Sequence, residues 1–332
     1  MTEEAASHSA ARFERILVTG GSGFVGRYML EALARAYPSA QRMSLARAGE
    51  ANPAPGWTPK AFDLLDPAAV EATIGETRPD LVIHLAAQSS AAKSFTAAEE
   101  TWRVNFIGSC NLAAALARHA AEAVVIFAST ADVYGSSLGE GAAHETMVPR
   151  PLNAYARSKL AAEAMLADVL PQTTRLIVAR PFSHIGPGQD KRFAVASFAA
   201  QIVEIENGHA EPRLSVGDLS VQRDFSDVRD VIDAYLRLIA IARDLPARNV
   251  FDIASGETRS LASVVERMRT LARRDFEIVV DPQRLRPADI PFAHCAAAKL
   301  RAATGWRPQR TIDETLVTLL DYWRAAAAEA PK

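Results

Sequence analysis

A tyrosine and a lysine stand four residues apart, at Tyr155 and Lys159, in an alanine-containing segment that we expect to be helical. Residues at this spacing share one face of a helix, so the phenol and the ammonium group would be neighbours. A fixed positive charge favours the tyrosinate and lowers the phenol pKa from about 10 toward neutral pH. Such a pair could exchange a proton with an alcohol or a ketone. The same spacing also occurs by chance on ordinary helix surfaces.

A hydroxyl side chain follows an expected strand. The apolar run that begins at Val124 predicts a buried strand ending at Ser129, and Thr130 comes next. A hydroxyl at a strand tip could hold the same oxygen as Tyr155 through a second hydrogen bond. Thr130, Tyr155 and Lys159 are therefore the predicted catalytic residues.

A glycine-rich turn near the N-terminus offers a place for phosphate groups. Gly20, Gly23 and Gly26 separate an apolar, strand-like run from a segment with apolar residues at helical spacing. Glycine permits positive φ and close approach of the backbone, so a pyrophosphate can rest against bare amide groups at a helix N-terminus. The simpler alternative is a turn that only joins a strand to a helix.

Strands and helices alternate along the following chain. This pattern predicts an α/β fold, a doubly wound parallel sheet of the Rossmann type with helices on both faces and ligands outside the carboxyl ends of the strands. We expect a frayed tail at 1–12, a dinucleotide-binding domain at 13–182 with returning segments near 224–258, and a smaller, interleaved substrate lobe at 183–330. The expected strands of the sheet are 41–46, 60–64, 81–85, 124–129, 176–179 and 250–253.

Composition narrows the function. The 332 residues are 49% hydrophobic and 23% charged, enough to bury a large core, and the net charge of −2 gives no general reason to bind nucleic acid or an anionic membrane. The two cysteines indicate no disulfide framework, and the seven histidines are scattered rather than spaced as metal ligands. The chain carries no secretion signal and no apolar run long enough to span a membrane, so we expect a cytoplasmic protein without a metal.

The end of the second strand reports on the cofactor. An acidic residue there would bind the ribose 2′-hydroxyl of NAD, whereas this chain reads Ser44-Leu45-Ala46-Arg47. A cation favours a 2′-phosphate, so NADPH is the expected cofactor and NADH the second choice. The alternative is that Arg47 is a solvated loop residue. Asp63 could bond the adenine amino group, or it could cap the next turn together with Asp66.

Several motifs together resemble a known family. Gly20 to Gly26, the run His84-Leu85-Ala86-Ala87-Gln88 and the Thr130, Tyr155 and Lys159 set are similar to the extended short-chain dehydrogenase/reductases of the NAD-dependent epimerase/dehydratase family. The resemblance covers about Arg15 to Trp323 and implies a nucleotide-sugar substrate. It also implies that Asn105 supports the site. The implied cofactor contacts are Gly20, Gly23, Phe24, Val25, Arg47, Asp63, Leu64, Leu85, Ala86, Ala87, Tyr155, Lys159 and Pro181.

The C-terminal motifs at 180–189, 222–230 and 284–291 most resemble the family's reductases of GDP-linked 4-keto-6-deoxy sugars. The likeness assigns Arg223 and Arg286 to the diphosphate or ribose, where arginine forks suit phosphate oxygens. Surface charges in loops are the alternative. Ser183 stands where those reductases commonly have Asn, and His184 is at least as well explained by a structural hydrogen bond. The implied substrate contacts are Ser89, Thr130, Ala131, Ser183, Arg223, Arg286 and Asp289.

Three other functions remain open at this stage. The family's dehydratases have Asp-Glu or Ser-Glu after the threonine, whereas Ala131 and Asp132 follow Thr130 here, which favours ketone reduction over dehydration. A nucleotide-sugar 4-epimerase uses the same three residues. An NADPH-sensing protein without catalysis would not need Tyr155 and Lys159. We also expect a homodimer formed by the helices near 97–119 and 152–170.

Overall fold

The computed structural model describes residues 12–46, 54–285 and 290–329. Seven parallel strands form the main sheet, in the order β10-β6-β5-β4-β1-β2-β3. The sheet confirms the predicted doubly wound α/β fold. Its strands are β1 (Arg15–Thr19), β2 (Gln41–Ala46), β3 (Thr58–Ala61), β4 (Leu81–His84), β5 (Val124–Ala128), β6 (Arg175–Pro181) and β10 (Arg248–Ile253).

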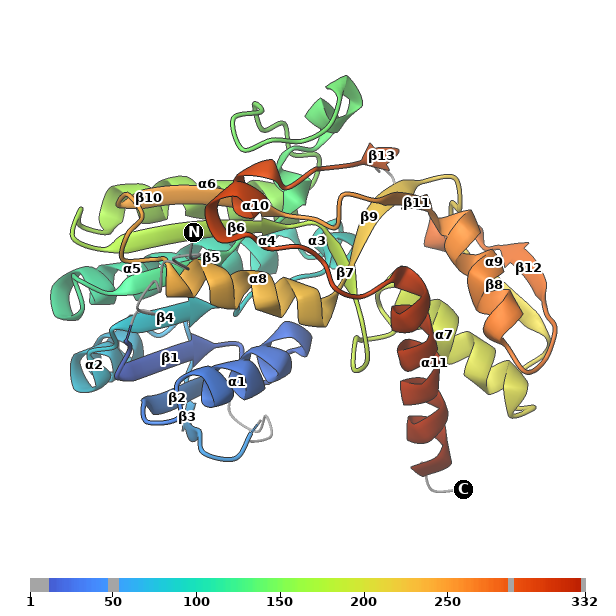
Figure 1. Cartoon of the computed structure of the whole chain (residues 1–332), viewed down its shortest axis with the longest axis horizontal. Coiled ribbons are helices and arrows are strands. Elements are labelled where there is room, and N and C mark those ends of the chain that lie inside the picture. Colours follow the sequence, from blue (N-terminus) through green and yellow to red (C-terminus); the bar gives the residue numbers. More distant parts are fainter. Residues whose placement is uncertain (1–11, 47–53, 286–289, 330–332) are drawn as a thin grey trace, which may run out of the picture.

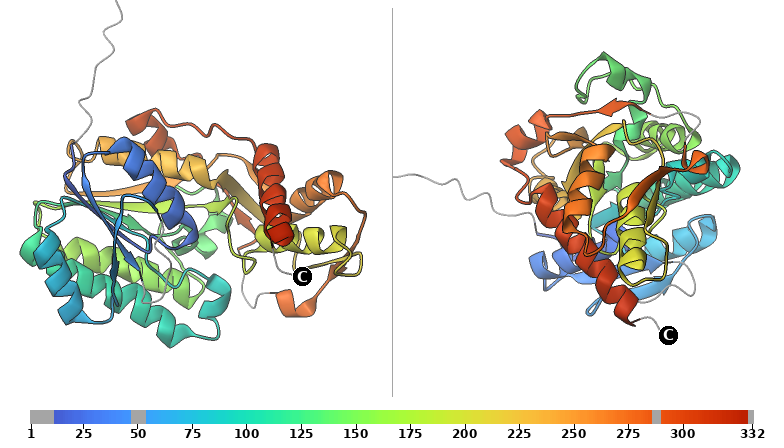
Figure 2. Two further views of the ribbon diagram at one scale, coloured as in Figure 1. Left: turned by 90° about the horizontal axis from the view of Figure 1, so that it is seen from below. Right: turned by 90° about the vertical axis from the view of Figure 1, so that its right-hand side faces the viewer.

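Helices cover both faces of this sheet (Figures 1 and 2). One face carries α1 (Phe24–Ala36) and α8 (Val228–Ala240), and the other carries α2 (Pro67–Thr77), α5 (Gly108–His119) and α6 (Ala154–Val169). Successive residues of β1 point to opposite faces, as in any strand buried on both sides: Ile16 and Val18 belong to the core under α1 and α8, and Leu17 to the core under the other helices.

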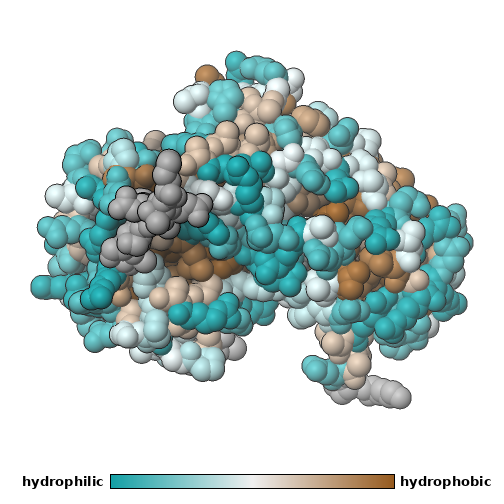
Figure 3. Space-filling model, viewed as in Figure 1, coloured by the Kyte–Doolittle hydropathy of each residue, from teal (hydrophilic) through white to brown (hydrophobic). Residues whose placement is uncertain are grey.

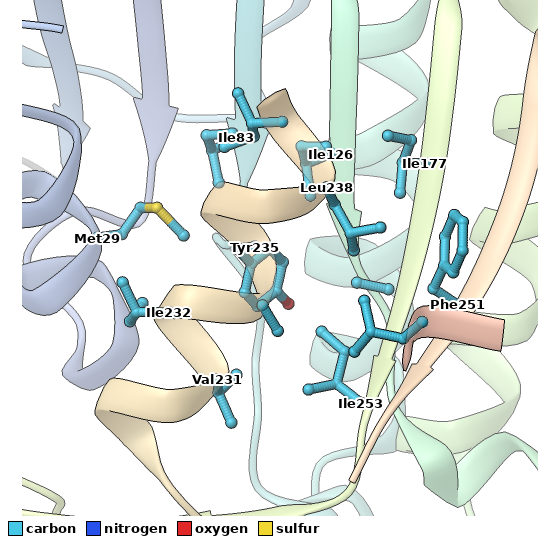
Figure 4. Packing of buried hydrophobic residues seen from close by; sticks show 14 of the residues in the cluster. Met29, Ile83, Ile126, Ile177, Val231, Ile232, Tyr235, Leu238, Phe251 and Ile253 are labelled. Carbon is cyan, nitrogen blue, oxygen red and sulfur yellow. The ribbon is translucent and has the colours of Figure 1, made fainter. Parts of the chain in front are cut away.

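The core beneath α8 is drawn in Figure 4. Branched residues of the strands and residues of the two helices interdigitate there, and each fully buried aliphatic side chain stabilises the fold by about 1.5–3 kcal/mol. The labelled members are Met29, Ile83, Ile126, Ile177, Val231, Ile232, Tyr235, Leu238, Phe251 and Ile253.

A smaller lobe has an apolar core of its own. It contains α7 (Ala194–Glu206), α9 (Leu261–Leu271), α11 (Ile312–Glu329) and the parallel pair of β8 (Arg213–Val216) and β12 (Glu277–Val280). A small sheet joins the lobes. In it β9 (Gln222–Asp227) pairs with β7 (Ser183–Ile185), β11 (Thr258–Ser260) and β13 (Phe292–Ala293). A domain division at 182/183 with returning segments near 224–258 stays our proposal.

The remaining elements are short. They are α3 (Ala91–Ser94), α4 (Ala98–Trp102), a π-helix (Arg103–Ile107), α10 (Ala298–Thr304) and 3-10 turns at Ala131–Val133, Ser136–Glu140 and Pro282–Arg284. The surface facing the viewer in Figure 3 is mostly hydrophilic, with apolar residues gathered in small groups. None of the helices within the described ranges is long and apolar enough to cross a membrane.

The structure corrects two predicted elements. The third strand ends at Ala61 rather than at Leu64, because Phe62 and Leu64 turn off the sheet edge into the core under α2 and α5. The single helix expected near 97–119 is α4, a π-helical turn and α5 in succession. Of the expected tail at 1–12, residues 1–11 lie outside the described residues.

Candidate active site

A cavity of about 1370 Å³ opens at the carboxyl ends of the main strands and extends to the smaller lobe. Its wall brings together all the predicted site residues that the structure describes. They are Gly20, Gly23, Phe24, Val25, Asp63, Leu64, Leu85, Ala86, Ala87, Ser89, Thr130, Ala131, Tyr155, Lys159, Pro181, Ser183 and Arg223. Three further predicted residues, Arg47, Arg286 and Asp289, lie outside the described residues.

The glycine turn approaches the neighbouring backbone closely. Gly20 has a φ of +74°, and a Cβ atom there would lie 2.8 Å from the amide nitrogen of Ala86. A Cβ atom on Gly26 would collide with the carbonyl oxygen of Gly20. Gly23 precedes α1 and offers the first turn no side-chain cap, so main-chain N–H groups at the helix N-terminus face the cavity side. This cradle fits the diphosphate of a dinucleotide.

Tyr155 and Lys159 occupy the first turns of α6. The helix begins at Ala154 because Asn153 caps it, its Oδ1 accepting a hydrogen bond from the amide of Ala156 at 2.9 Å. Tyr155 is 9% exposed and Lys159 is 2% exposed. The ammonium Nζ donates to the carbonyl oxygen of Ala128 at 2.7 Å. The ammonium group therefore sits at the end of β5, and the two residues share one face of α6 as their spacing predicted.

Thr130 completes this group from the other side. Its Oγ1 accepts a hydrogen bond from the amide of Asp132 at 3.1 Å, and its side chain also hydrogen-bonds the phenol of Tyr155. Thr130 thus caps the 3-10 turn Ala131–Val133 that follows it. Hydroxyl and phenol meet in the same cavity, where they could hold one carbonyl oxygen between them.

The expected effect of Lys159 on the phenol is wrong for this structure. Burial and the carboxylate of Asp132 raise the pKa of Tyr155, and only the Thr130 hydrogen bond acts to lower it. Lys159 is itself desolvated, so burial lowers its pKa to about 7, although Glu163 acts to raise it. Lys159 is therefore not a permanently charged neighbour of the phenol near pH 7. Tyr155 keeps its proton near neutral pH, which is the form of a general acid.

Asn105 supports the site from the π-helical turn. Its Oδ1 accepts from the amide of Gln88 at 2.8 Å, and its Nδ2 donates to the Ser158 hydroxyl at 3.0 Å. Ser158 lies on α6 between the two predicted catalytic side chains. The buried amide therefore fastens α6 to the loop after β4.

His184 and Asp63 make local structural contacts. The Nδ1 atom of His184 bonds the carbonyl oxygen of Phe182 at 3.0 Å, and its ring stacks on Phe24 at 6.1 Å between centroids. One carboxylate oxygen of Asp63 accepts from the amide of Leu65 at 2.9 Å. Asp63 thus makes the turn contact that was one of its two expected roles, while a contact to adenine stays a prediction.

Cationic side chains gather toward the smaller lobe, where a sugar nucleotide's diphosphate was expected. Arg223 of β9 lines the cavity, and its contact to the diphosphate or ribose stays a prediction. Lys191, Arg192 and Arg284, which were not predicted, line the same cavity. Arg284 donates to the Ser215 hydroxyl at 3.1 Å and lies 3.5 Å from Asp281. Charge alone could have singled these residues out, but no spacing pattern separated them from other surface cations.

Comparisons with known proteins agree with this geometry. A model of the NAD dependent epimerase/dehydratase family matches residues 16–254. The chain belongs to this family. The resemblance inferred from its motifs is therefore confirmed, and the match extends from β1 to just past β10.

Individual members of the epimerase/dehydratase family are similar over nearly the whole chain. GDP-6-deoxy-D-mannose reductase from Pseudomonas aeruginosa is 37% identical over 319 residues, covering 95% of this chain and 99% of that protein. The structure of RMD from Pseudomonas aeruginosa complexed with NADPH superimposes with a TM-score of 0.78 at 34% identity, over 94% of this chain and 98% of the other. dTDP-L-rhamnose 4-epimerase from Burkholderia thailandensis is 29% identical, covering 90% of this chain and 92% of that protein.

Proposed function

We propose that this family member reduces the 4-keto group of GDP-4-dehydro-6-deoxy-D-mannose with NADPH, giving GDP-D-rhamnose or its epimer at carbon 4. The observation that carries the proposal is the single cavity that joins the glycine cradle to the Thr130 and Tyr155 pair. The likeness to the Pseudomonas aeruginosa GDP-6-deoxy-D-mannose reductase supports the substrate. The NADPH complex of the similar structure supports the cofactor.

The cradle residues fit the cofactor. Main-chain amides of Phe24 and Val25 would hold its diphosphate, since the Gly23 amide already donates to the carbonyl oxygen of Gly20 at 3.1 Å. Leu85, Ala86, Ala87 and Pro181 would lie along the cofactor toward Tyr155. NADPH bound in this position supplies the hydride for carbon 4. Arg47 is proposed to prefer the 2′-phosphate, so Arg47→Ala should narrow the difference between the Kd values of NADPH and NADH; an unchanged difference would remove Arg47 from the site.

The chain's own residues then handle the oxygen and its proton. Thr130 donates a hydrogen bond that orients the carbonyl oxygen. Tyr155, which keeps its proton because of burial and Asp132, gives that proton to the developing oxyanion. Lys159 is proposed to hold the nicotinamide ribose. Burial of all three residues excludes water from the reacting oxygen.

Two other activities are proposed as alternatives. The 4-epimerase among the relatives favours an epimerase, which would use the same three residues. A GDP-mannose 4,6-dehydratase is less favoured, because Ala131 cannot transfer a proton and Asp132 is one methylene shorter than glutamate. A non-catalytic NADPH sensor has no use for the buried Tyr155 and Lys159.

The deciding experiment supplies the full chain with NADPH and GDP-4-dehydro-6-deoxy-D-mannose. The proposal expects oxidation of NADPH and a 6-deoxy product whose stereochemistry at carbon 4 is read by NMR. In a second arm, GDP-mannose and NAD are supplied without a reductant. Formation of a keto sugar in that arm would establish the dehydratase instead, and interconversion of 4-epimers with NAD alone would establish the epimerase.

We also propose a homodimer in the cytoplasm. Large apolar side chains are exposed along the predicted contact helices, among them Trp102 at 36%, Ile107 at 45% and Val169 at 37%. The two cysteines remain thiols, which suits a reducing compartment. Sedimentation of the wild type and of Ile107→Glu should give a dimer and a monomer. Val148→Glu, at another exposed apolar residue, is the control.

A further inference from the structure

A buried ion pair lies beneath the proposed catalytic residues. Arg180 of β6 binds Glu163 of α6 through two parallel hydrogen bonds, Nε to Oε1 at 3.0 Å and Nη2 to Oε2 at 2.5 Å. The two side chains are 6% and 8% exposed. Glu163 lies one helical turn after Lys159 and two turns after Tyr155, so all three residues project from one face of α6.

The same ion pair reaches the loop that carries Thr130. On the near side of Thr130, the hydroxyl of Ser129 donates to Oε1 of Glu163. On the far side, the remaining guanidinium nitrogen Nη1 of Arg180 donates to the phenol oxygen of Tyr134 at 3.0 Å. Both flanks of the loop are therefore bonded to one guanidinium–carboxylate pair.

The hydroxyl of Tyr134, at the other end of this hydrogen-bond network, also has an acceptor. The phenol of Tyr134 donates to the carboxylate of Asp252 on β10, with oxygen distances of 2.8 and 3.0 Å. Tyr134 and Asp252 are fully buried. Every polar group along the path from Ser129 to Asp252 has a partner, which is the condition under which a buried network holds a unique geometry.

We propose that Arg180, held between Glu163 and Tyr134, is a positioning residue that fixes the loop bearing Thr130 against the helix bearing Tyr155. The inference rests on the proposed reduction, because Arg180 acts there only through Thr130 and Tyr155. A bidentate guanidinium sets both distance and orientation between the elements it joins, which a single hydrogen bond does not. The distance between the loop of Thr130 and the helix of Tyr155 is set by non-covalent contacts such as these.

Two gentle substitutions test the proposal without removing Arg180. Tyr134→Phe deletes one hydroxyl and leaves the ion pair intact, and Glu163→Gln keeps the shape of the side chain but removes its charge. Glu206→Gln is the matched control, since Glu206 forms a comparable buried pair with Arg324 at 2.7 Å in the smaller lobe. Thermal unfolding of the full-length variants establishes that each is folded at the assay temperature.

Amide hydrogen exchange provides a readout that needs no substrate. The amides of Tyr134 and Gly135 bond the carbonyls of Ala131 and Asp132 at 3.0 and 3.1 Å, so the 129–135 segment should be protected in the wild type. We expect exchange in this segment to rise about tenfold in Tyr134→Phe and Glu163→Gln, and to stay unchanged in Glu206→Gln.

Kinetics provide the second readout. In Tyr134→Phe, which leaves Glu163 and the charge of Lys159 in place, kcat should fall about tenfold while KM for the sugar nucleotide and Kd for NADPH stay nearly constant, because displaced catalytic groups weaken binding of the transition state and not of the substrate. In Glu163→Gln kcat should fall by at least as much. Glu163→Asp, which restores the charge but not the reach, should not restore kcat. Exchange and kcat like those of the control would overturn the proposal. Failure of the wild type to oxidise NADPH would refute the proposed reduction. The comparison of hydrogen-exchange rates would still test whether Arg180 positions the loop.

Discussion

The ammonium Nζ of Lys159 lies 2.7 Å from the carbonyl oxygen of Ala128, the last residue of β5. The contact ties the helix that carries Tyr155 to the strand that leads into Thr130. The same nitrogen lies 4.6 Å from the centre of the Phe127 ring. Lys159 so placed holds α6 against the end of β5, and burial lowers its pKa to about 7.

Replacing Tyr155 tests the assigned acid. Tyr155→Phe keeps the buried ring and removes the proton that the carbonyl oxygen requires, so kcat should fall by about 10²- to 10⁴-fold. The Kd for NADPH, measured by fluorescence titration, should be nearly unchanged. Tyr37→Phe, at the end of α1 and away from the cavity lining, is the control and should retain full activity. Turnover by Tyr155→Phe at the wild-type rate would remove Tyr155 from the mechanism.

The activity should depend on pH through Lys159. Burial lowers its pKa to about 7, so its charged fraction declines as the pH rises through neutrality. If the ribose contact needs the ammonium form, kcat should decrease toward alkaline pH. Glu163 raises the pKa of Lys159, so in Glu163→Gln the decrease should begin at lower pH. A kcat profile measured from about pH 6 to about pH 9 checks both statements, and coincident profiles would contradict them.

The glycine cradle should not tolerate a side chain. Gly20→Ala would place a Cβ atom 2.8 Å from the Ala86 amide at a φ of +74°, so the turn would have to shift and the affinity for NADPH should fall about tenfold or more. Gly139→Ala is the matched control because its Cβ atom would meet nothing within 4 Å. Equal Kd values for the two variants would argue against phosphate binding at the cradle.

His84 should make stability depend on pH. Its ring bonds the hydroxyls of Thr19 at 2.7 Å and Ser109 at 2.9 Å, and burial lowers its pKa to about 3. At a pH below about 6.5, the ordinary pKa of histidine, His84 is protonated in the unfolded chain but stays neutral in the folded chain. This contribution to the free energy of unfolding is therefore complete above pH 6.5 and is lost as the pH falls toward 3.

Urea unfolding at pH 7.5 and about pH 5 measures that loss. His84→Gln removes the titrating ring, so it should be less stable than the wild type at pH 7.5 and should lose less stability on acidification. An identical pH dependence for both proteins would mean that another group is responsible.

Local patterns predicted most of the main sheet and the site. β1 and β5 contain the apolar runs Ile16–Val18 and Val124–Ala128, and the fourth-residue spacing of Tyr155 and Lys159 placed both on one face of α6. β9 was not among the expected strands, because Gln222, Arg223 and Asp224 give it no apolar run. The carboxylate of Asp224 is nevertheless fully buried and accepts bonds from the amides of Ser255 and Gly256 at 2.7 and 2.8 Å.

The partners in the buried network were beyond any local pattern. Tyr134 and Asp252 are separated by 118 positions, and Glu163 and Arg180 belong to different elements. Glu163 could have been noticed as the next residue on the face of α6 that carries Lys159. Arg180 gave no signal of its own, since an arginine at a strand end is usually exposed.

The seventh strand of the main sheet has a consequence for synthesis of the protein. β10 pairs with β6, yet it lies beyond residues that build part of the smaller lobe. While the ribosome makes this intervening stretch, at about 5–20 residues per second, the emerging β6 is an unpaired edge for several seconds. A nascent chain stalled before Arg248 should therefore bind chaperones or aggregate more than the completed chain does.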